Sequence, residues 1–283
     1  MLDVLLSCRN ASSTIEDCID SILCQTHEDF NLYVFDDAST DDTVDKVKSY
    51  SDTRLYLISS KSNIGTYASK NFMLKNFCTS KLVALHDADD VSHPDRFLRQ
   101  TNELQETTAV CVGTAVLETW KLGSYPHTKC TTTTSAKFRR VNYYPPRIYM
   151  GMFKHALSQT QPGVEHELFL KYKFCMNGSV MFKREALLKV GGWDGTTFIG
   201  ADTDMFVRLL AVGDVKNMRD VLYERRFHEN SLTTSETYGM GSPTREIYSK
   251  RLVETAKSVA QDKIVHMSFF HPNFEYEVTH CVE

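Results

Sequence analysis

Short apolar runs alternate with segments of helical spacing through the first hundred residues. Runs of four to seven apolar residues bounded by polar ones are typical of buried strands, and apolar side chains every three or four positions are typical of helices. The pattern predicts strands at 3–8, 31–37, 54–59 and 81–87, and helices over 15–23, after Ser39, near 67–77 and from Pro94 to about Glu106. Such alternation indicates an α/β fold with a Rossmann-like, mainly parallel central sheet flanked by helices.

Polar residues mark the expected starts of these helices. Ser13 and Glu16 have the spacing of a capping box ahead of the first helix. Ser39 is a candidate N-cap for the second helix. Pro94 occupies an expected first helical position, where its fixed φ is favourable.

The second half of the chain has a weaker pattern. A further strand is expected at 109–116, but residues 117–175 contain a threonine run and a proline pair without a sustained period. That stretch predicts loops on one face of the sheet, where specificity is commonly carried. Beyond it we expect a strand and a helix ended by the glycine pair 191–192, a helix with Asp202 in its first turn, and a last helix over about 244–261.

Composition and charge limit the classes of function. The 283 residues include 42% hydrophobic side chains, enough to bury a substantial core in one large domain or in two small ones. The net charge is −4, and basic residues cluster only in pairs such as Arg139-Arg140 and Arg225-Arg226. A surface that follows nucleic-acid phosphates needs more positive charge, so no nucleic-acid partner is expected.

The eight cysteines lie in apolar stretches without a CxxC or zinc-type spacing. They are expected to be buried, reduced thiols. No apolar run reaches membrane-spanning length, and the residues after Met1 lack the pattern of a secretory leader. These features predict a protein of the reducing cytoplasm with no transmembrane segment, and they leave a membrane-bound partner open.

Two acidic clusters follow the ends of predicted strands. Asp36 and Asp37 end the second strand, and three aspartates stand within residues 87–90 after the fourth. Ligands bind beyond the carboxyl ends of parallel strands, so both clusters are expected to face one polar ligand. Asp87 and Asp89 point to the same side of an extended segment, where a divalent cation would relieve their repulsion. Mg²⁺ or Mn²⁺, completed by a nucleotide diphosphate, suits such carboxylates.

An isolated DADD sequence is more often a solvated turn, but further motifs accompany this one. They are VLLSCRNASSTIEDCIDSILCQTHEDFNLYVFDDASTDDT, SNIGTYASKN, LHDADDVSHPDRF, GSVMFKREALLKVGGWDG and GADTDMFVRLLAVGD, in this order. Together they resemble the successive motifs of family 2 glycosyltransferases with the GT-A fold, from residue 2 to about 235. The resemblance implies an inverting transfer of a sugar from a nucleotide-diphosphate sugar, most commonly a UDP-sugar, to an acceptor hydroxyl. The acceptor would be a glycan, a glycoconjugate or a protein-linked sugar.

The resemblance implies roles for the aspartates of these motifs. Asp36 or Asp37, with Asp37 preferred, would bind the base of the nucleotide. Asp87 would contact the ribose or the donor sugar, and Asp89 would ligate the metal that bridges the two phosphates. Asp202 would be the general base, kept ionised with the help of the helix N-terminus.

Three other motif residues, Arg9, Lys70 and His228, have two interpretations each. Ser7 and Arg9 would line the nucleotide site, although Arg9 also fits a surface charge. Lys70 would neutralise a phosphate where the family commonly has an arginine, or would lie exposed on its helix. His228 would reach the metal or the pyrophosphate, or would be structural.

The later motifs supply the expected pocket for the donor sugar. Asn177, Gly178 and Ser179 would line this pocket. Trp193 would stack on a sugar ring or belong to the core.

The resemblance also suggests how the chain is divided. A single GT-A domain is expected over residues 1–235, with a nucleotide-binding half at 1–116 and an acceptor-binding half at 117–235. Residues 236–283 would add a helical and aromatic extension, whose helix is a candidate contact for a homodimer.

Three other classes share part of the pattern. Residues 87–91 fit the DxDx[TV] motif of haloacid-dehalogenase-type phosphatases, but that motif belongs on the first strand rather than the fourth. A nucleotidyltransferase would need a glycine-rich loop after the first strand, where SCRNASS has no glycine. A degenerate transferase that binds a sugar nucleotide or glycan without turnover stays open, because Ala201 stands where the family has a glutamate.

Overall fold

The computed structural model describes residues 1–120, 137–141, 175–228, 237–239, 242–261, 263–267, 269 and 272–281. Its strands are β1 Leu2–Cys8, β2 Phe30–Asp36, β3 Leu55–Ser60, β4 Leu82–Asp87, β5 Val91–Ser92, β6 Ala109–Trp120, β7 Lys137–Val141, β8 Met181–Lys183, β9 Asp214–Phe227 and β10 Tyr276–His280. Within the described residues they form one sheet in the order β10-β3-β2-β1-β4-β8-β6-β9-β5, with β7 paired to β6. The central strands β3, β2, β1 and β4 run parallel, whereas β10, β8 and β5 pair antiparallel with their neighbours.

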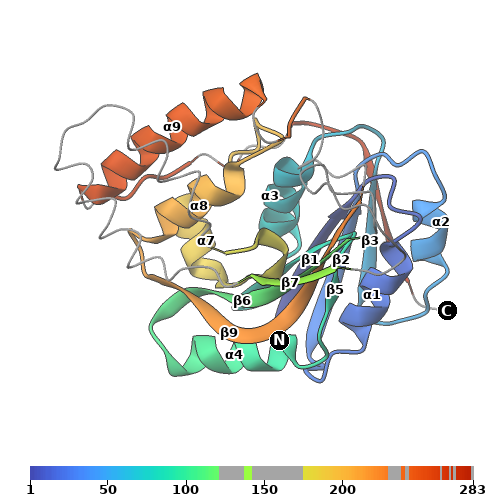
Figure 1. Cartoon of the computed structure of the whole chain (residues 1–283). Coiled ribbons are helices and arrows are strands. Elements are labelled where there is room, and N and C mark those ends of the chain that lie inside the picture. Colours follow the sequence, from blue (N-terminus) through green and yellow to red (C-terminus); the bar gives the residue numbers. More distant parts are fainter. Residues whose placement is uncertain are drawn as a thin grey trace.

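Helices cover both faces of this sheet (Figure 1). They are α1 Ile15–Leu23, α2 Thr43–Lys48, α3 Thr66–Asn76, α4 Arg96–Glu106, α7 Arg184–Val190, α8 Ala201–Leu209 and α9 Pro243–Ala260, with a 3₁₀ turn, η1, at Asn177–Ser179. One core lies between the sheet and α1, α2 and α4, and a second lies between the sheet and α3, α7, α8 and α9. The α/β architecture expected from the sequence is confirmed.

The strand β1 shows how an apolar run specifies a central position in the sheet. Val4 and Leu6 belong to the core that contains α1, whereas Leu5 belongs to the core that contains α3. All three side chains are fully buried. Successive side chains of a strand point to opposite faces, so a continuous apolar run fits a strand that is covered on both sides.

The helix α1 begins at Ile15 as expected, but three expected features of the helix starts are wrong. The helix α1 begins without a side-chain cap, so Ser13 and Glu16 form no capping box. The N-cap of α2 is Asp42, because Ser39 instead accepts a hydrogen bond from the backbone of a neighbouring loop. Pro94 precedes α4, and its carbonyl accepts a hydrogen bond from another loop. Contacts between loops, which local helix patterns do not contain, decide the starts of α2 and α4.

The strands β5, β7, β9 and β10 were not expected from the sequence. The pairing of β9 with β6 shifts register at three places, so β9 lacks the regular alternation that would identify a strand. The strand β10 pairs antiparallel with β3 and thereby brings residues of the C-terminal extension to the edge of the sheet. Within 117–175, where we expected loops, β6 continues to Trp120 and β7 is a strand; residues 121–136 and 142–174 lie outside the described residues.

The described cysteines are free thiols, and all but one are buried. The exception is Cys24, where the expectation of a buried thiol is wrong. Cys130 lies outside the described residues. In the part of the chain that the structure describes, no helix is both long and apolar enough to cross a membrane.

Candidate active site at the carboxyl ends of the parallel strands

The strand β1 lies between the two acidic clusters. Its last residue, Cys8, pairs with Asp36 of β2, and its neighbour Ser7 pairs with Asp87 of β4. Adjacent strands are about 4.8 Å apart, which places the two clusters about 10 Å from each other across β1. The expectation that the two clusters lie close together at the carboxyl ends of the parallel strands is confirmed.

The two aspartates after β2 make different contacts. The carboxylate of Asp37 accepts hydrogen bonds from the backbone N–H groups of Ile64 at 2.6 Å and Gly65 at 2.8 Å, which fixes the loop before α3. Asp36 accepts one from the N–H of Ser39 at 3.2 Å, but its buried Oδ1 has no hydrogen-bond partner among the described residues. Burial raises the pKa of both carboxyls. Both carboxylate oxygens of Asp37 therefore accept hydrogen bonds from the protein, whereas Oδ1 of Asp36 remains able to accept one from a ligand.

Asp87 lies next to a buried cation and a glycine. Its Oδ1 is 3.7 Å from Nζ of Lys70, which is only 1% exposed, so the alternative of an exposed helix lysine is wrong. Withdrawal from water raises the pKa of the Asp87 carboxyl, and the ammonium of Lys70 opposes this rise. A Cβ on Gly178 would lie 2.7 Å from Oδ2 of Asp87 and 2.2 Å from the hydroxyl of Tyr223. A side chain at position 178 would therefore require Asp87 and Tyr223 to move.

The end of β9 holds the loop that carries Asp89. Nε2 of His228 lies 2.9 Å from Oδ2 of Asp89, and this hydrogen bond raises the pKa of His228. Arg226 donates from its guanidinium to the backbone carbonyl of Asp89 at 2.6 Å, and from its backbone N–H to Asp90 at 2.9 Å. Burial raises the pKa of the Asp90 carboxyl, whose Oδ2 has no hydrogen-bond partner within the described ranges.

The donor atoms of Asp89 and His228 suit a divalent cation. A carboxylate oxygen and an imidazole nitrogen are ligands that Mn²⁺ accepts, and Mg²⁺ favours the carboxylate. The two side chains are 32% and 41% exposed, so a ligand can approach both. In the described part of the chain there is no group of three or more His, Cys, Asp or Glu side chains arranged to hold a metal. A cation at this pair would therefore take further ligands from a bound phosphate or from water.

Asp202 lies in the first turn of α8, as predicted. The hydroxyl of Tyr67, from the first turn of α3, donates to Oδ1 of Asp202 across 3.4 Å. The Nζ of Lys70 lies 6.0 Å from the centre of the same tyrosine ring, which connects Asp202 to the surroundings of Asp87. Asp204, by contrast, is buried in an ion pair within α8.

The structure places the remaining expected residues as follows. Ser7 lies 2.8 Å from a serine hydroxyl of α3, and Arg9 is exposed. Oδ1 of Asn177 is buried without a hydrogen-bond partner among the residues described, directly before Gly178. Trp193 is fully buried and packs edge-on against Phe182 in the core. Its ring has no exposed face for a sugar, which favours the core interpretation.

Two tyrosines of the site were not expected from the sequence. Tyr67 stands inside the motif SNIGTYASKN, so closer attention to that motif would have found it. Tyr223 accepts a hydrogen bond from the N–H of Asp87 at 3.2 Å. It belongs to β9, whose irregular pattern gives no local signal.

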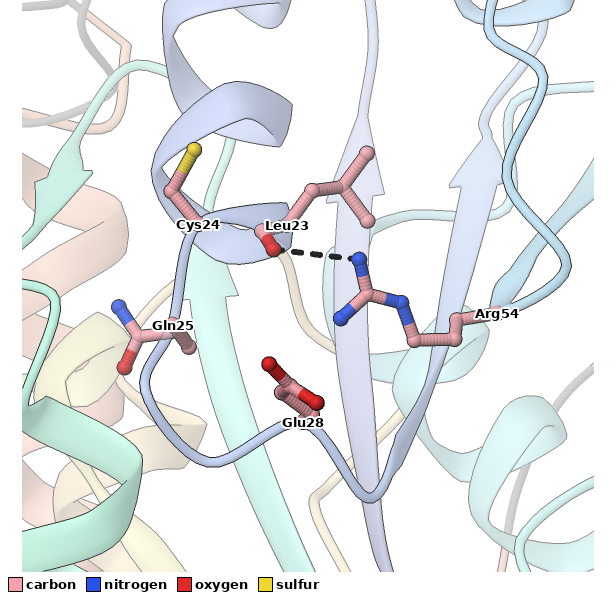
Figure 2. A pocket seen from close by; sticks show the side chains of 5 residues that line it. All are labelled: Leu23, Cys24, Gln25, Glu28 and Arg54. Atoms are coloured by element: carbon pink, nitrogen blue, oxygen red, sulfur yellow. Dashed lines mark hydrogen bonds between the residues drawn. The ribbon is translucent and has the colours of Figure 1, made fainter.

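A separate pocket lies near the amino ends of the strands β2 and β3 (Figure 2). It is lined by Leu23, Cys24, Gln25, Glu28 and Arg54, from the last residue of α1 and the segments before β2 and β3. The guanidinium of Arg54 donates to the carbonyl of Leu23 at 3.1 Å and pairs with Asp52 at 2.8 Å. Its charge is thus already paired, and the pocket contains none of the expected site residues.

Comparison with known proteins identifies the sequence family. The family model described as glycosyl transferase family 2 matches residues 3–191, more than half of the chain. The bifunctional glycosyltransferase pgtA of Dictyostelium discoideum is 38% identical over 97 residues, which is 32% of this chain and 13% of that protein. The matched stretch is thus a small part of that relative.

Solved structures share the fold at low sequence identity. S. aureus TarS (residues 1–349, in complex with UDP-GlcNAc) has a TM-score of 0.64 at 14% identity, covering 91% of this chain and 66% of that one. The mannosyltransferase PcManGT from Pyrobaculum calidifontis, in complex with GDP-Man and Mn²⁺, has a TM-score of 0.56 at 16% identity, covering 92% and 73%. The expected GT-A fold is confirmed. With its motifs in order and the family model matched, this chain belongs to glycosyl transferase family 2.

Proposed function

We propose that the protein is an inverting glycosyltransferase. It transfers a sugar from a nucleotide-diphosphate sugar, with a UDP-sugar as first choice, to an acceptor hydroxyl on a glycan, a glycoconjugate or a protein-linked sugar. The observation that carries this proposal is a set of buried acceptor oxygens near the carboxyl ends of the parallel strands. None of these oxygens has a hydrogen-bond partner among the described residues. They are Oδ1 of Asp36, Oδ2 of Asp90 and Oδ1 of Asn177. Buried polar atoms are normally hydrogen-bonded, so these atoms fit a polar ligand.

The nucleotide is bound beside β1. Asp36 accepts a hydrogen bond from an N–H of the base through its unpaired oxygen, while Asp37 holds the loop at Ile64 and Gly65. Lys70 places a positive charge beside Asp87, where the negative diphosphate and the donor sugar are held. The UDP-GlcNAc in the TarS complex supports a UDP-sugar as the donor.

Asp89 and His228 are the candidate ligands for Mn²⁺ or Mg²⁺. When bound, the cation supplies positive charge that stabilises the leaving diphosphate. Arg226 keeps the backbone of Asp89 in place through its bond to the carbonyl. The Mn²⁺ in the PcManGT complex, which shares the fold, supports a divalent cation at this site.

Asp202 accepts the proton of the acceptor hydroxyl. The hydroxyl of Tyr67 contacts one oxygen of this carboxylate and orients it. The acceptor oxygen then attacks the anomeric carbon from the face opposite the diphosphate, which inverts the configuration. General bases of this kind contribute roughly 10² to 10⁴ in rate.

A thermal-shift screen of nucleotide sugars, with and without Mn²⁺, tests the proposed donor and metal. A ligand that binds only the folded state raises the melting temperature, and the rise grows with the logarithm of its concentration relative to its Kd. We expect UDP-sugars to raise it, and more strongly with Mn²⁺. No shift with any nucleotide sugar would contradict the proposal.

The second candidate is a protein that binds a sugar nucleotide without turnover. Ala201, which stands beside the candidate base in place of a glutamate, is the observation in its favour. Release of UDP from UDP-glucose in the presence of Mn²⁺ separates the candidates. A protein that binds UDP-glucose and releases no UDP would support the second candidate.

A further inference from the structure

The segment between α7 and α8, residues 191–200, leads directly to Asp202. The helix α9 lies beside α8 on the same side of the sheet (Figure 1). It lies outside residues 3–191, which match the family model. Three side chains of α9 contact this segment or the first turn of α8, each at a different place.

The first contact neutralises a buried carboxylate. Asp194 is only 2% exposed, and its Oδ1 accepts hydrogen bonds from the N–H of Thr196 at 3.1 Å and from its hydroxyl at 2.6 Å. An NH₂ group of Arg251 lies 2.5 Å from the other oxygen of Asp194. A buried charge without its partner is strongly unfavourable, so Arg251 stabilises the turn that Asp194 forms.

The second contact lies at the start of α8. Gly200 is the N-cap of α8 and has a φ of +78°, in the left-handed region that favours glycine. A Cβ at this position would lie 2.4 Å from Cδ1 of Tyr248. The ring of Tyr248 therefore packs directly on the backbone two residues before Asp202.

The third contact connects α9 to the first turn of α8. The hydroxyl of Thr255 donates to Oδ1 of Asp204 at 2.9 Å, and Nε of Arg208 donates to Oδ2 of Asp204 at 2.7 Å. Arg208 also donates to the carbonyl of Gly192 at 2.8 Å. One network thus joins α9, the first turn of α8 and the beginning of the 191–200 segment.

We propose that α9 positions the candidate base, with Arg251, Tyr248 and Thr255 as positioning residues. They set the place and direction of the first turn of α8, and therefore of the Asp202 carboxylate. A base must lie within hydrogen-bond reach of the proton it takes, and a displacement of about 1 Å can cost about 10²-fold in rate. This inference rests on the proposed function, in which Asp202 is the base.

The test compares Thr255→Val and Arg251→Met with Glu254→Gln as the matched control. Thr255→Val keeps the shape of the side chain, and Arg251 is half-exposed, so both variants are expected to fold. Glu254 belongs to the same helix and is paired with Lys257 on its exposed surface. The probes are UDP-glucose turnover to UDP with Mn²⁺, the thermal shift with UDP, and hydrogen exchange of amides 195–204.

We expect both variants to lose about 10-fold to 100-fold in UDP-glucose turnover, because water, like an acceptor, needs the base. Amides 195–204 should exchange faster, while the UDP shift and the KM for UDP-glucose stay near the wild type. The conservative changes Thr255→Ser and Arg251→Lys should restore turnover and protection. Glu254→Gln should change none of these quantities.

Wild-type turnover and wild-type exchange in both variants would overturn the role of α9. A parallel loss of UDP binding would also overturn it, because it would indicate general damage rather than misplacement of the base. If the wild type itself neither binds UDP nor turns over UDP-glucose, the proposed function fails instead. In that case the exchange of amides 195–204 alone decides whether α9 holds this segment.

Discussion

His228 and Asp89 are 139 residues apart in the chain, and Nε2 of one lies 2.9 Å from Oδ2 of the other. The contact joins the end of β9 to the loop after β4, two segments that are far apart in the sequence. Arg226 adds a bond from the same end of β9 to the carbonyl of Asp89. These hydrogen bonds therefore hold the two candidate metal ligands next to each other.

Replacement of the candidate metal ligands should abolish the metal-dependent part of donor binding. We expect Asp89→Ala and His228→Ala to remove the additional thermal shift that Mn²⁺ gives with UDP, and to keep a cooperative melting transition. Asp220→Ala is the matched control, because Asp220 is also a partly exposed carboxylate 2.7 Å from a basic side chain, that of Arg99. Sugar transfer by Asp89→Ala that persists in EDTA would contradict the assignment.

The two aspartates in the first turn of α8 should respond in opposite ways. Asp202→Asn should lower transfer by roughly 10² to 10⁴, because the amide cannot accept a proton, while the melting temperature and the UDP shift change little. Asp204→Asn should instead destabilise the fold, by about 3–5 kcal/mol, because Arg208 is fully buried and loses its partner. Kinetics and thermal unfolding of both variants check this contrast.

The stereochemistry of the product gives an independent check on the base. An α-linked donor sugar should yield a β-linked product, which NMR of the first product can show. Retention of the configuration, or near-normal kcat in Asp202→Asn, would mean that another group does this work.

A side chain at position 178 should displace Asp87 or Tyr223. Gly178→Ala places a Cβ 2.2 Å from the hydroxyl of Tyr223 and 2.7 Å from Asp87, so something must move. Overpacking of this kind typically costs about 1–3 kcal/mol, and donor affinity should fall with it. Tyr223→Phe removes the nearest atom, so the double variant should recover part of the lost stability. Equal unfolding free energies of Gly178→Ala and wild type would contradict this geometry.

His86 should stay neutral far below the usual range for histidine. Its Nδ1 lies 2.9 Å from the carbonyl oxygen of Asp87, which only accepts, so Nδ1 carries the proton and Nε2 accepts from the hydroxyl of Ser92. Burial and the nearby charge of Arg96 lower the pKa of His86 from 6.5 to about 3. ¹H–¹⁵N NMR should therefore find one neutral tautomer from pH 8 to about pH 4, and a titration midpoint near 6.5 would contradict it.

The lowered pKa of His86 also makes the stability of the fold depend on pH. Between pH 6.5 and about 3, the unfolded chain binds a proton at His86 that the folded chain does not bind. The contribution of His86 to the free energy of unfolding therefore falls as the pH falls, by up to about 1.4 kcal/mol per pH unit. The stability difference between wild type and His86→Gln, measured by denaturant unfolding across this range, should shrink accordingly.

Local patterns predicted the parts of the fold that depend on neighbours in sequence. The continuous apolar run of β1 and the glycine pair that ends α7 were sufficient for a central strand and for a helix end, and Gly191 has a φ of +78°. The helix start expected at Ser39 is wrong because Ser39 accepts a hydrogen bond from a loop that is 29 residues away in the sequence. The strand β9 was missed because its pairing with β6 is irregular.

The same distinction applies to the candidate site. The motifs placed Asp36 and Asp87 at strand ends and Asp202 in the first turn of a helix, because each belongs to a recognisable element. They did not distinguish the contacts of Asp36 from those of Asp37, since the bonds to Ile64 and Gly65 depend on a loop nearly thirty residues away. The roles of the site residues, the division of the chain at residue 235 and a dimer through α9 remain predictions.

The pairing of β10 with β3 has a consequence for synthesis of the chain. The strand β3 ends at Ser60, and its antiparallel partner Tyr276 follows more than two hundred residues later. At about 5–20 residues per second, the ribosome needs on the order of 10–40 s to deliver that partner. During this time the backbone groups along the outer edge of β3 have no strand to pair with, and such an edge can recruit other chains. The nascent chain therefore exposes this edge of β3 until β10 is made, and a chaperone that covers sheet edges should act in this interval.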